Sequence, residues 1–160
     1  MPNPIGRRGF LQSSAGALGA AGRVPSFGQS RQHAPSGRVR LGLIGLGVRG
    51  RDHHLRLLAS NPQVEIGALC DVDRRHADFA AQILMRSSGR RPPVYSDFRK
   101  LLDQKDLDAV VISTPDHWHS IITIQAIEAG KDVYCEKPLT LFIAEGRAMA
   151  ETARRYGAVV

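Results

Sequence analysis

Apolar residues along this chain fall into short continuous runs, and each run is followed by a longer segment with apolar side chains at helical spacing. The runs favour β-strands over 39–44, 64–70, 94–95, 108–113 and 132–136. The periodic segments predict helices over about 48–60, 74–86, 98–102, 118–129 and 141–156. Because nearly continuous apolar strands that alternate with helices belong to parallel sheets covered on both faces, the pattern predicts an α/β fold.

The expected architecture is a doubly wound parallel sheet built from residues 38–160. Its strand order should be 3-2-1-4-5-6, and Ala158-Val159-Val160 begins a sixth strand that is cut short. In such sheets the ligand crevice lies at the carboxyl ends of strands 1 and 4. A chain of 160 residues is long enough to bury one core of this kind.

The charge of the chain is concentrated at its N-terminus. The net charge is +7, but residues 1–40 hold six of the 22 basic residues and no acidic one. The remaining 16 basic residues face 15 acidic ones and form no single-sign block. A nucleic-acid-binding domain would carry a basic stripe on its folded part, so this partner class is excluded.

A glycine-rich turn follows the first predicted strand, with the sequence Gly45-Leu46-Gly47-Val48-Arg49-Gly50. In this strand-turn-helix context G-x-G-x-x-G predicts a dinucleotide site of the Rossmann type. Gly45 permits the tight turn, Gly47 leaves room for the pyrophosphate, and Gly50 lets helix and strand pack closely. The helix that begins at Val48 offers free N–H groups to the phosphates. Arg49 either adds a charged contact or faces solvent.

Asp71 ends the second predicted strand, 21 residues after Gly50. A carboxylate at this spacing accepts hydrogen bonds from the ribose hydroxyls of the adenosine half. It also repels a 2′-phosphate, so NAD is favoured, while Arg74 and Arg75 keep NADP open. The same carboxylate could cap the following helix, which is compatible with ribose binding.

The fourth predicted strand ends in Ser113-Thr114-Pro115-Asp116-His117-Trp118-His119. Pro115 holds Thr114 extended, which places both at the crevice near the nicotinamide half, together with His119. The two histidines lack a full set of further ligands close in sequence, so no metal is expected. Cys70 and Cys135 end predicted strands and are interpreted as buried thiols, with a disulfide left open.

The fifth predicted strand ends in Glu136-Lys137-Pro138. Pro138 holds Lys137 extended and aims it across the crevice. A lysine beside a nicotinamide can exchange a proton with a substrate hydroxyl, so Lys137 is the candidate catalytic residue, and Glu136 and Lys137 also join the predicted cofactor site. The alternative is a solvated surface cation.

These motifs, taken in order, resemble the glucose-fructose oxidoreductase, inositol dehydrogenase and rhizopine catabolism family (Gfo/Idh/MocA). The resemblance rests on the glycine turn, Cys-Asp-Val-Asp, Thr-Pro-Asp-His-Trp-His, and Ala-Gly-Lys-Asp-Val-Tyr-Cys-Glu-Lys-Pro-Leu. It implies hydride transfer between a sugar or cyclitol carbon and nicotinamide, with Lys137 matching the family lysine. The family's substrate domain, through which its members assemble, is not in this sequence, so we expect this chain alone to bind a dinucleotide weakly and to turn over no substrate. Two alternatives remain open: an NAD-dependent glycoside hydrolase that oxidises its sugar transiently, and a non-catalytic dinucleotide-binding module.

Residues 1–37 resemble a twin-arginine export signal followed by a disordered linker. Arg7 and Arg8 precede a weakly apolar run over 13–22, which is too short and glycine-rich to span a bilayer. A protein that acquires its dinucleotide in the cytoplasm must cross in the folded state, and this export route carries folded proteins. We therefore expect a periplasmic or secreted protein; the alternative is a disordered tail on a cytoplasmic one.

Overall fold

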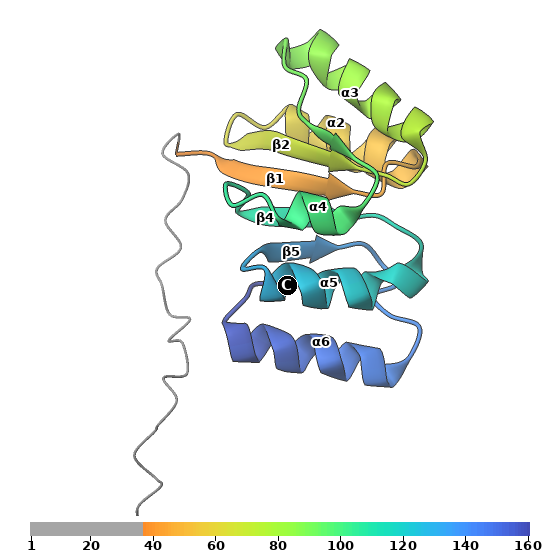
Figure 1. The fold of residues 1–160 in the computed structure, drawn as a ribbon, viewed down its shortest axis with the longest axis vertical. Coiled ribbons are helices and arrows are strands. Elements are labelled where there is room, and N and C mark those ends of the chain that lie inside the picture. Colours follow the sequence, from red (N-terminus) through yellow and green to blue (C-terminus); the bar gives the residue numbers. More distant parts are fainter. Residues whose placement is uncertain (1–36) are drawn as a thin grey trace, which may run out of the picture.

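The computed structural model describes residues 37–160 and contains a parallel sheet of five strands (Figure 1). The strands are β1 (Val39–Ile44), β2 (Val64–Cys70), β3 (Val94–Tyr95), β4 (Ala109–Ile112) and β5 (Asp132–Cys135). Their order is β3-β2-β1-β4-β5, and every neighbouring pair is parallel. The predicted Rossmann-type α/β fold and its strand order are thus confirmed for these five strands.

The helical segments are η1 (Arg49–Leu55), α2 (Arg56–Ala59), α3 (Arg74–Ser88), α4 (Phe98–Leu102), η2 (Asp116–Trp118), α5 (His119–Glu128) and α6 (Ile143–Tyr156). Aspartates cap two of them: the Asp73 carboxylate accepts from the Arg75 N–H, and the Asp97 carboxylate accepts from the Arg99 N–H. Glycines in the left-handed conformation end α3 and α6.

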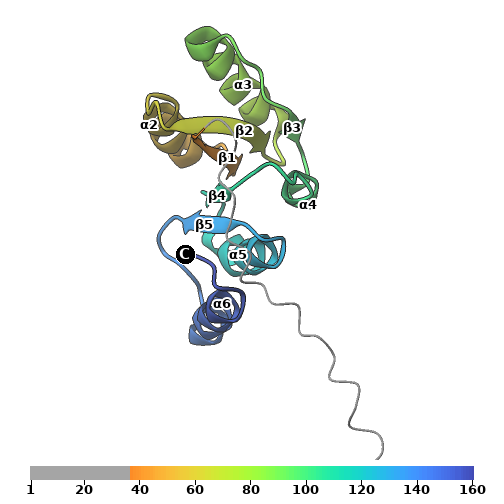
Figure 2. The same ribbon diagram turned by 90° about the vertical axis from the view of Figure 1, so that its left-hand side faces the viewer.

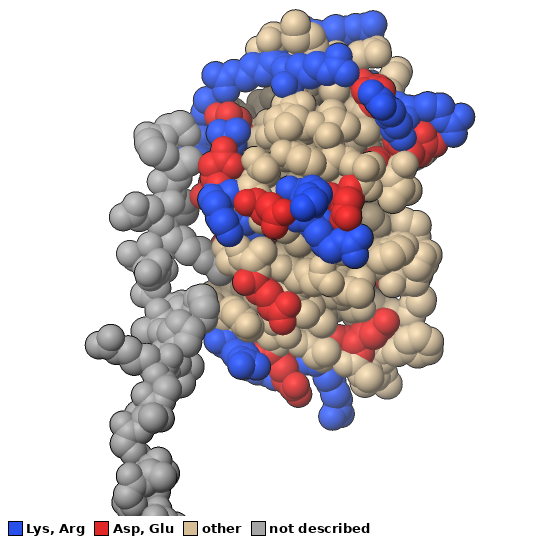
Figure 3. All heavy atoms as spheres, in the orientation of Figure 1, with Lys and Arg blue, Asp and Glu red and all other residues tan. Residues whose placement is uncertain are grey.

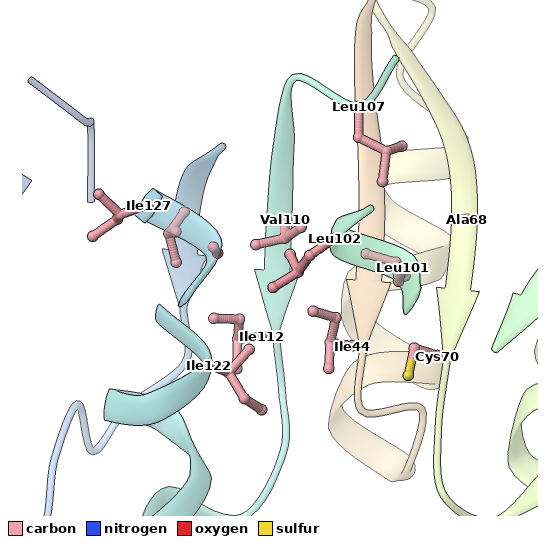
Figure 4. Packing of buried hydrophobic residues seen from close by; sticks show 12 residues of the cluster. Ile44, Ala68, Cys70, Leu101, Leu102, Leu107, Val110, Ile112, Ile122 and Ile127 are labelled. Atoms are coloured by element: carbon pink, nitrogen blue, oxygen red, sulfur yellow. The ribbon is translucent and has the colours of Figure 1, made fainter. Parts of the chain in front are cut away.

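Each strand sends alternate side chains to opposite faces of the sheet. Leu43 and Leu69 join the cluster under η1 and α3, whereas Ile44 and Cys70 join the cluster under α4 and α5. Figure 2 shows α2 on one side of the sheet and α4 and α5 on the other. Figure 4 shows the second cluster, in which Ile112 and Ile122 pack beside Ile44. The alternation is the physical basis of the predicted two-sided sheet.

Ala158–Val160 do not form the predicted sixth strand. The Val133 N–H donates to the Val159 carbonyl at 2.9 Å, and the Val159 N–H donates to the Asp132 carboxylate at 2.7 Å. This segment therefore lies on the free edge of β5, where a sixth strand would pair. A single backbone hydrogen bond from three residues does not make a ladder, which is why the structure has five strands.

The surface carries its charges in mixed groups. Figure 3 shows acidic side chains next to basic ones on the face it presents. No helix among the described residues is long and apolar enough to cross a membrane.

Candidate functional site

A cleft of about 720 Å³ opens at the carboxyl edge of the sheet, where β1, β2 and β4 end. Its position is the one that the strand order predicts, because the connection from β1 to β2 and the connection from β4 to β5 lie on opposite faces of the sheet and separate there. The predicted site residues on its wall are Gly45, Gly47, Val48, Arg49, Asp71, Thr114 and Pro115.

The glycine turn forms the floor of this cleft. Gly45 has φ +87°, and a Cβ there would lie 2.6 Å from the Ser113 carbonyl carbon and the Thr114 nitrogen. A Cβ on Gly50 would collide with the Gly45 carbonyl oxygen, whereas a Cβ on Gly47 would meet no atom within 4 Å. Two glycines therefore allow close packing, and the third leaves space on the cleft side, which is the division of roles that a pyrophosphate-binding turn requires.

Asp71 ties the end of β2 to this turn. Its Oδ2 accepts from the Leu46 N–H at 2.6 Å, and its Oδ1 accepts from the Asp73 N–H at 2.8 Å. A carboxylate has about four lone-pair positions, so two accepted hydrogen bonds leave acceptor capacity toward the cleft. Asp71 does not cap α3, because Asp73 does so; this part of the sequence interpretation was wrong by two residues.

The connection from β3 to α4 forms another wall, with Ser96, Asp97, Phe98 and Arg99. This contribution could not be predicted from the sequence, because the segment has no motif and reaches the cleft only through its place beside β2. The Arg99 side chain is held by the Asp97 carboxylate at 2.8 Å.

Two loop residues after β4 present hydroxyl groups with no partner in the described part of the protein. The Ser113 Oγ and Thr114 Oγ1 are buried and accept or donate no hydrogen bond there. Both residues line the cleft, and Pro115 and the half-exposed Trp118 lie next to them. Buried hydroxyls without partners are costly, so these groups favour a polar ligand or water at this wall.

His119 lies beneath the cleft and not on its wall. The residue is 1% exposed, the ring Nε2 lies 2.8 Å from the Thr114 carbonyl oxygen, and the ring Nδ1 lies 2.8 Å from the Pro138 carbonyl oxygen. Carbonyl oxygens only accept, so each contact becomes a hydrogen bond when the facing nitrogen carries a proton. The geometry gives His119 the task of joining the loops that follow β4 and β5.

Glu136 is buried at the end of β5 and receives three donors. Its Oε2 accepts from the Arg49 Nε at 2.6 Å and contacts the His54 Nε2 at 2.7 Å, and its Oε1 accepts from the Lys137 N–H at 3.0 Å. The hydrogen bond from the Arg49 guanidinium, followed by that from His54, lowers the pKa of the Glu136 carboxyl from 4.5 to about 2. Glu136 is therefore ionised at neutral pH.

Lys137 is exposed and begins the loop after β5, joined to Pro138 by a cis peptide bond. Its backbone is held by Glu136, but its side chain is not among those that line the cleft. Lys137 and Asp71 nevertheless stand at the same edge of the sheet, since both follow the carboxyl ends of parallel strands. The catalytic role of Lys137 stays a prediction.

The residues of this cleft fit a dinucleotide. An open Gly47, a carboxylate with spare acceptor capacity at the end of β2, and buried hydroxyls after β4 lie along one cleft at the carboxyl edge of the sheet. Within residues 37–160 no group of three or more His, Cys, Asp or Glu side chains is arranged to hold a metal ion. Cys70 and Cys135 are free thiols, the first buried and the second half-buried.

Fold and cleft together define a Rossmann-type nucleotide-binding domain. Residues 39–160 match the family model described as the oxidoreductase family with an NAD-binding Rossmann fold, Gfo/Idh/MocA. The chain therefore belongs to this family, and the prediction of a nicotinamide dinucleotide as cofactor is confirmed.

Among curated proteins, the chain is similar to "Glycosyl hydrolase family 109 protein 1" of Shewanella sp. strain ANA-3, with 36% identity over 121 residues. It has the same identity to "Alpha-N-acetylgalactosaminidase" of Shewanella oneidensis. Each alignment covers 73% of this chain and 26% of the relative, so the chain spans about a quarter of the length of these relatives.

Among solved structures, the chain is similar to myo-inositol 2-dehydrogenase from Lactobacillus plantarum, with 30% identity and a TM-score of 0.65 over 74% of this chain and 34% of that one. GenD2 from gentamicin A biosynthesis in complex with NAD gives 30% identity and a TM-score of 0.68 over 76% and 33%. The 3-ketoreductase KijD10 from Actinomadura kijaniata in complex with NADP gives 27% identity and a TM-score of 0.67, over 77% of this chain and 37% of that one.

Proposed function

We propose that this domain binds NAD in the cleft at the carboxyl edge of the sheet and serves hydride transfer at a hydroxyl-bearing carbon of a sugar or cyclitol. The observation that carries the proposal is the link from the Asp71 carboxylate to the Leu46 N–H, which joins the ribose-binding acid to the pyrophosphate-binding turn in one rigid unit. Bound nicotinamide would accept or donate the hydride.

The residues of the chain would divide the work along the cleft. Asp71 would accept from the adenosine ribose hydroxyls, and the turn at Gly47 and Val48 would take the pyrophosphate with its N–H groups. Thr114 and Pro115 would border the nicotinamide half. Lys137 would exchange the proton of the substrate hydroxyl.

Charge near Asp71 supports NAD over NADP. Three carboxylates, those of Asp71, Asp73 and Asp97, line the cleft where a 2′-phosphate would lie. The arginines of this region are already paired, because Arg75 contacts Asp73 at 2.7 Å and Arg99 contacts Asp97 at 2.8 Å. A 2′-phosphate would therefore meet more negative charge than free positive charge.

Calorimetric titration of the purified protein with NAD and with NADP tests this preference. We expect NAD to bind at least tenfold more tightly than NADP. Asp71→Asn should weaken NAD binding by about tenfold, because a charged acceptor for the ribose hydroxyls is lost. NADP affinity should change less, because the charge that repels its 2′-phosphate is lost as well. A folded protein that binds neither dinucleotide would overturn the proposed function, and tighter NADP binding would overturn the preference.

A second candidate is an NAD-dependent glycoside hydrolase. It is favoured by the 36% identity to glycosyl hydrolase family 109 proteins. In both candidates a hydride leaves a sugar carbon, but the hydrolase returns it and releases an alcohol by elimination and addition of water. The protein purified from its natural source should be incubated with NAD and either myo-inositol or nitrophenyl N-acetylgalactosaminide. Net NADH formation identifies a dehydrogenase, whereas nitrophenol release without net NADH identifies the hydrolase.

Export and assembly complete the proposal. Arg7 and Arg8 lie outside the described residues, and we infer from their sequence context that they direct export by the twin-arginine route. Replacing both by lysine should retain the protein in the cytoplasm, as measured by fractionation; unchanged export would contradict it.

We expect residues 38–160 to contribute no subunit interface, so the 160-residue chain should sediment as a monomer.

A further inference from the structure

Two side chains that are five residues apart reach one carboxylate oxygen. Arg49 and His54 both belong to η1, and both contact the Glu136 Oε2, at 2.6 Å and 2.7 Å. In an α-helix residues five apart point about 140° away from each other. The segment Arg49–Leu55 is π-helical, so residue i is bonded to residue i+5 and the two side chains stand on one face.

The wider turn therefore serves a carboxylate that comes from a distant segment of the chain. Glu136 is largely buried at the end of β5, and an ionised carboxylate there needs donors from the helix that packs above it. His54 is also largely buried, with its ring edge-to-face against Tyr134 at 5.3 Å between ring centroids. An α-helical turn would direct only one of Arg49 and His54 to Glu136 and leave the buried carboxylate with one side-chain partner fewer.

This contact joins the two ends of the candidate site. Arg49 immediately precedes Gly50 in the glycine turn, lines the cleft and is half-exposed there. The other oxygen of Glu136 accepts from the Lys137 N–H. One carboxylate thus holds the helix that follows the phosphate-binding turn and the backbone of the candidate proton donor.

A guanidinium has five N–H donors. The Nε of Arg49 is used by Glu136, and its two terminal nitrogens are suited to a bidentate contact with a phosphate. The anchored arginine is also pre-organised, so ordering it costs less when an anion binds.

We propose that Glu136 is a positioning residue that holds Arg49 toward the pyrophosphate of the dinucleotide, with His54 as its second anchor. The inference rests on the proposed function, since it names the group of the ligand that Arg49 meets. Glu136 then acts on binding through Arg49, without a contact of its own with the cofactor.

A double-mutant cycle in the full chain tests this dependence, with NADH affinity measured by fluorescence titration. Glu136→Gln should raise the Kd for NADH about tenfold in the wild-type background and less than twofold when Arg49 is already glutamine. Equal effects in the two backgrounds would overturn the inference. A wild-type chain that does not bind NADH would overturn the proposed function instead.

A matched control comes from the same helix. Arg51 pairs with Asp52 at 2.9 Å, and neither lines the cleft. Asp52→Asn removes a carboxylate partner of an arginine without touching the site. It should leave the Kd for NADH unchanged within twofold and show no coupling to Arg49→Gln.

A spectroscopic signature separates positioning from mere support of the fold. The ³¹P resonances of bound NAD should move in the same direction in Glu136→Gln and in Arg49→Gln, and stay unmoved in Asp52→Asn. Should Glu136→Gln not fold, Glu136→Asp takes its place in the cycle, because the shorter side chain keeps the charge but draws it away from Arg49. Resonances that move in Arg49→Gln alone would contradict the inference.

Discussion

The two edges of the sheet treat charge and hydrogen bonding in different ways. At the amino edge, the Arg40 N–H donates to Asp108 at 2.7 Å and the Arg40 guanidinium contacts Asp106 at 3.2 Å. Lys131, 3% exposed, donates to the carbonyl oxygens of Gln104 and Leu107 at 2.7 Å and 2.8 Å. At this edge charged groups close loops onto one another, although the Arg40 Nε has no partner in the described part of the protein.

At the carboxyl edge the polar groups are held but not saturated. Asp71 keeps acceptor capacity, and the hydroxyls of Ser113 and Thr114 have no partner in the described part of the protein. Gly47 adds open space beside them. The comparison indicates that the amino edge stabilises the fold, whereas the carboxyl edge retains hydrogen-bonding groups for a ligand.

The largest expected effect separates two glycines of the same turn. Gly50→Ala puts a methyl group against the Gly45 carbonyl oxygen, so it should destabilise the protein by about 2–3 kcal/mol and weaken NADH binding at least a hundredfold. Gly47→Ala meets no atom within 4 Å, so it should leave stability within about 0.5 kcal/mol and still weaken binding. Urea unfolding and NADH titration measure the two effects. Loss of stability in Gly47→Ala would contradict this division.

At the amino edge, Lys131→Met should lower the free energy of unfolding by about 2 kcal/mol, because two buried carbonyl oxygens lose their donor. Burial lowers the pKa of Lys131, and its stabilising hydrogen bonds require no ligand. NADH affinity should stay within twofold of wild type. A change in affinity without a change in the urea midpoint would show that the edges do not divide the work in this way.

A smaller effect is expected on the stability of the protein at low pH. Because the pKa of Glu136 is lowered from 4.5 to about 2 in the folded protein, its ionised form adds stability that is complete above pH 4.5 and is lost as pH falls toward 2. The difference in urea midpoint between wild type and Glu136→Gln should therefore be constant from pH 7 to about 5 and shrink below 4.5. A difference that grows on acidification would refute the ionised state of this carboxyl.

The smallest effect is expected at the thiols. Burial raises the pKa of Cys70 to about 12 and that of Cys135 to about 11, so neither is a thiolate at neutral pH. Both should react with a disulfide reagent far more slowly than a free thiol, and faster only in urea. Rapid reaction of Cys135 in the native protein would indicate that the end of β5 opens.

Local sequence patterns predicted most of the fold. Continuous apolar runs located the strands, and the glycine turn with Asp71 located one side of the cleft, because these features depend on neighbours in the chain. The helix boundaries differ by a few residues where caps decide them, as at Ile143, where α6 begins two residues later than its apolar spacing predicts. The sixth strand was predicted from three apolar residues that make only one backbone hydrogen bond with β5.

Only part of the candidate site could be predicted from local sequence patterns. His119 was expected at the cofactor, but its ring is buried between two carbonyl oxygens from loops that only the sheet brings together. Arg49 and Glu136 are 87 residues apart, and no spacing rule connects them. The wall from Ser96 to Arg99 has no motif at all.

The order of strands and helices, the tight turn at Gly45 and the acid at the end of β2 follow from the amino-acid sequence alone, because backbone conformation and apolar periodicity are set by residues close in the chain. Only the tertiary structure determined which donors surround the Glu136 carboxylate. It also explains why the helix after the turn is widened over Arg49–Leu55. A buried charge is stabilised by whatever groups the folded sheet places around it, and those groups come from distant segments.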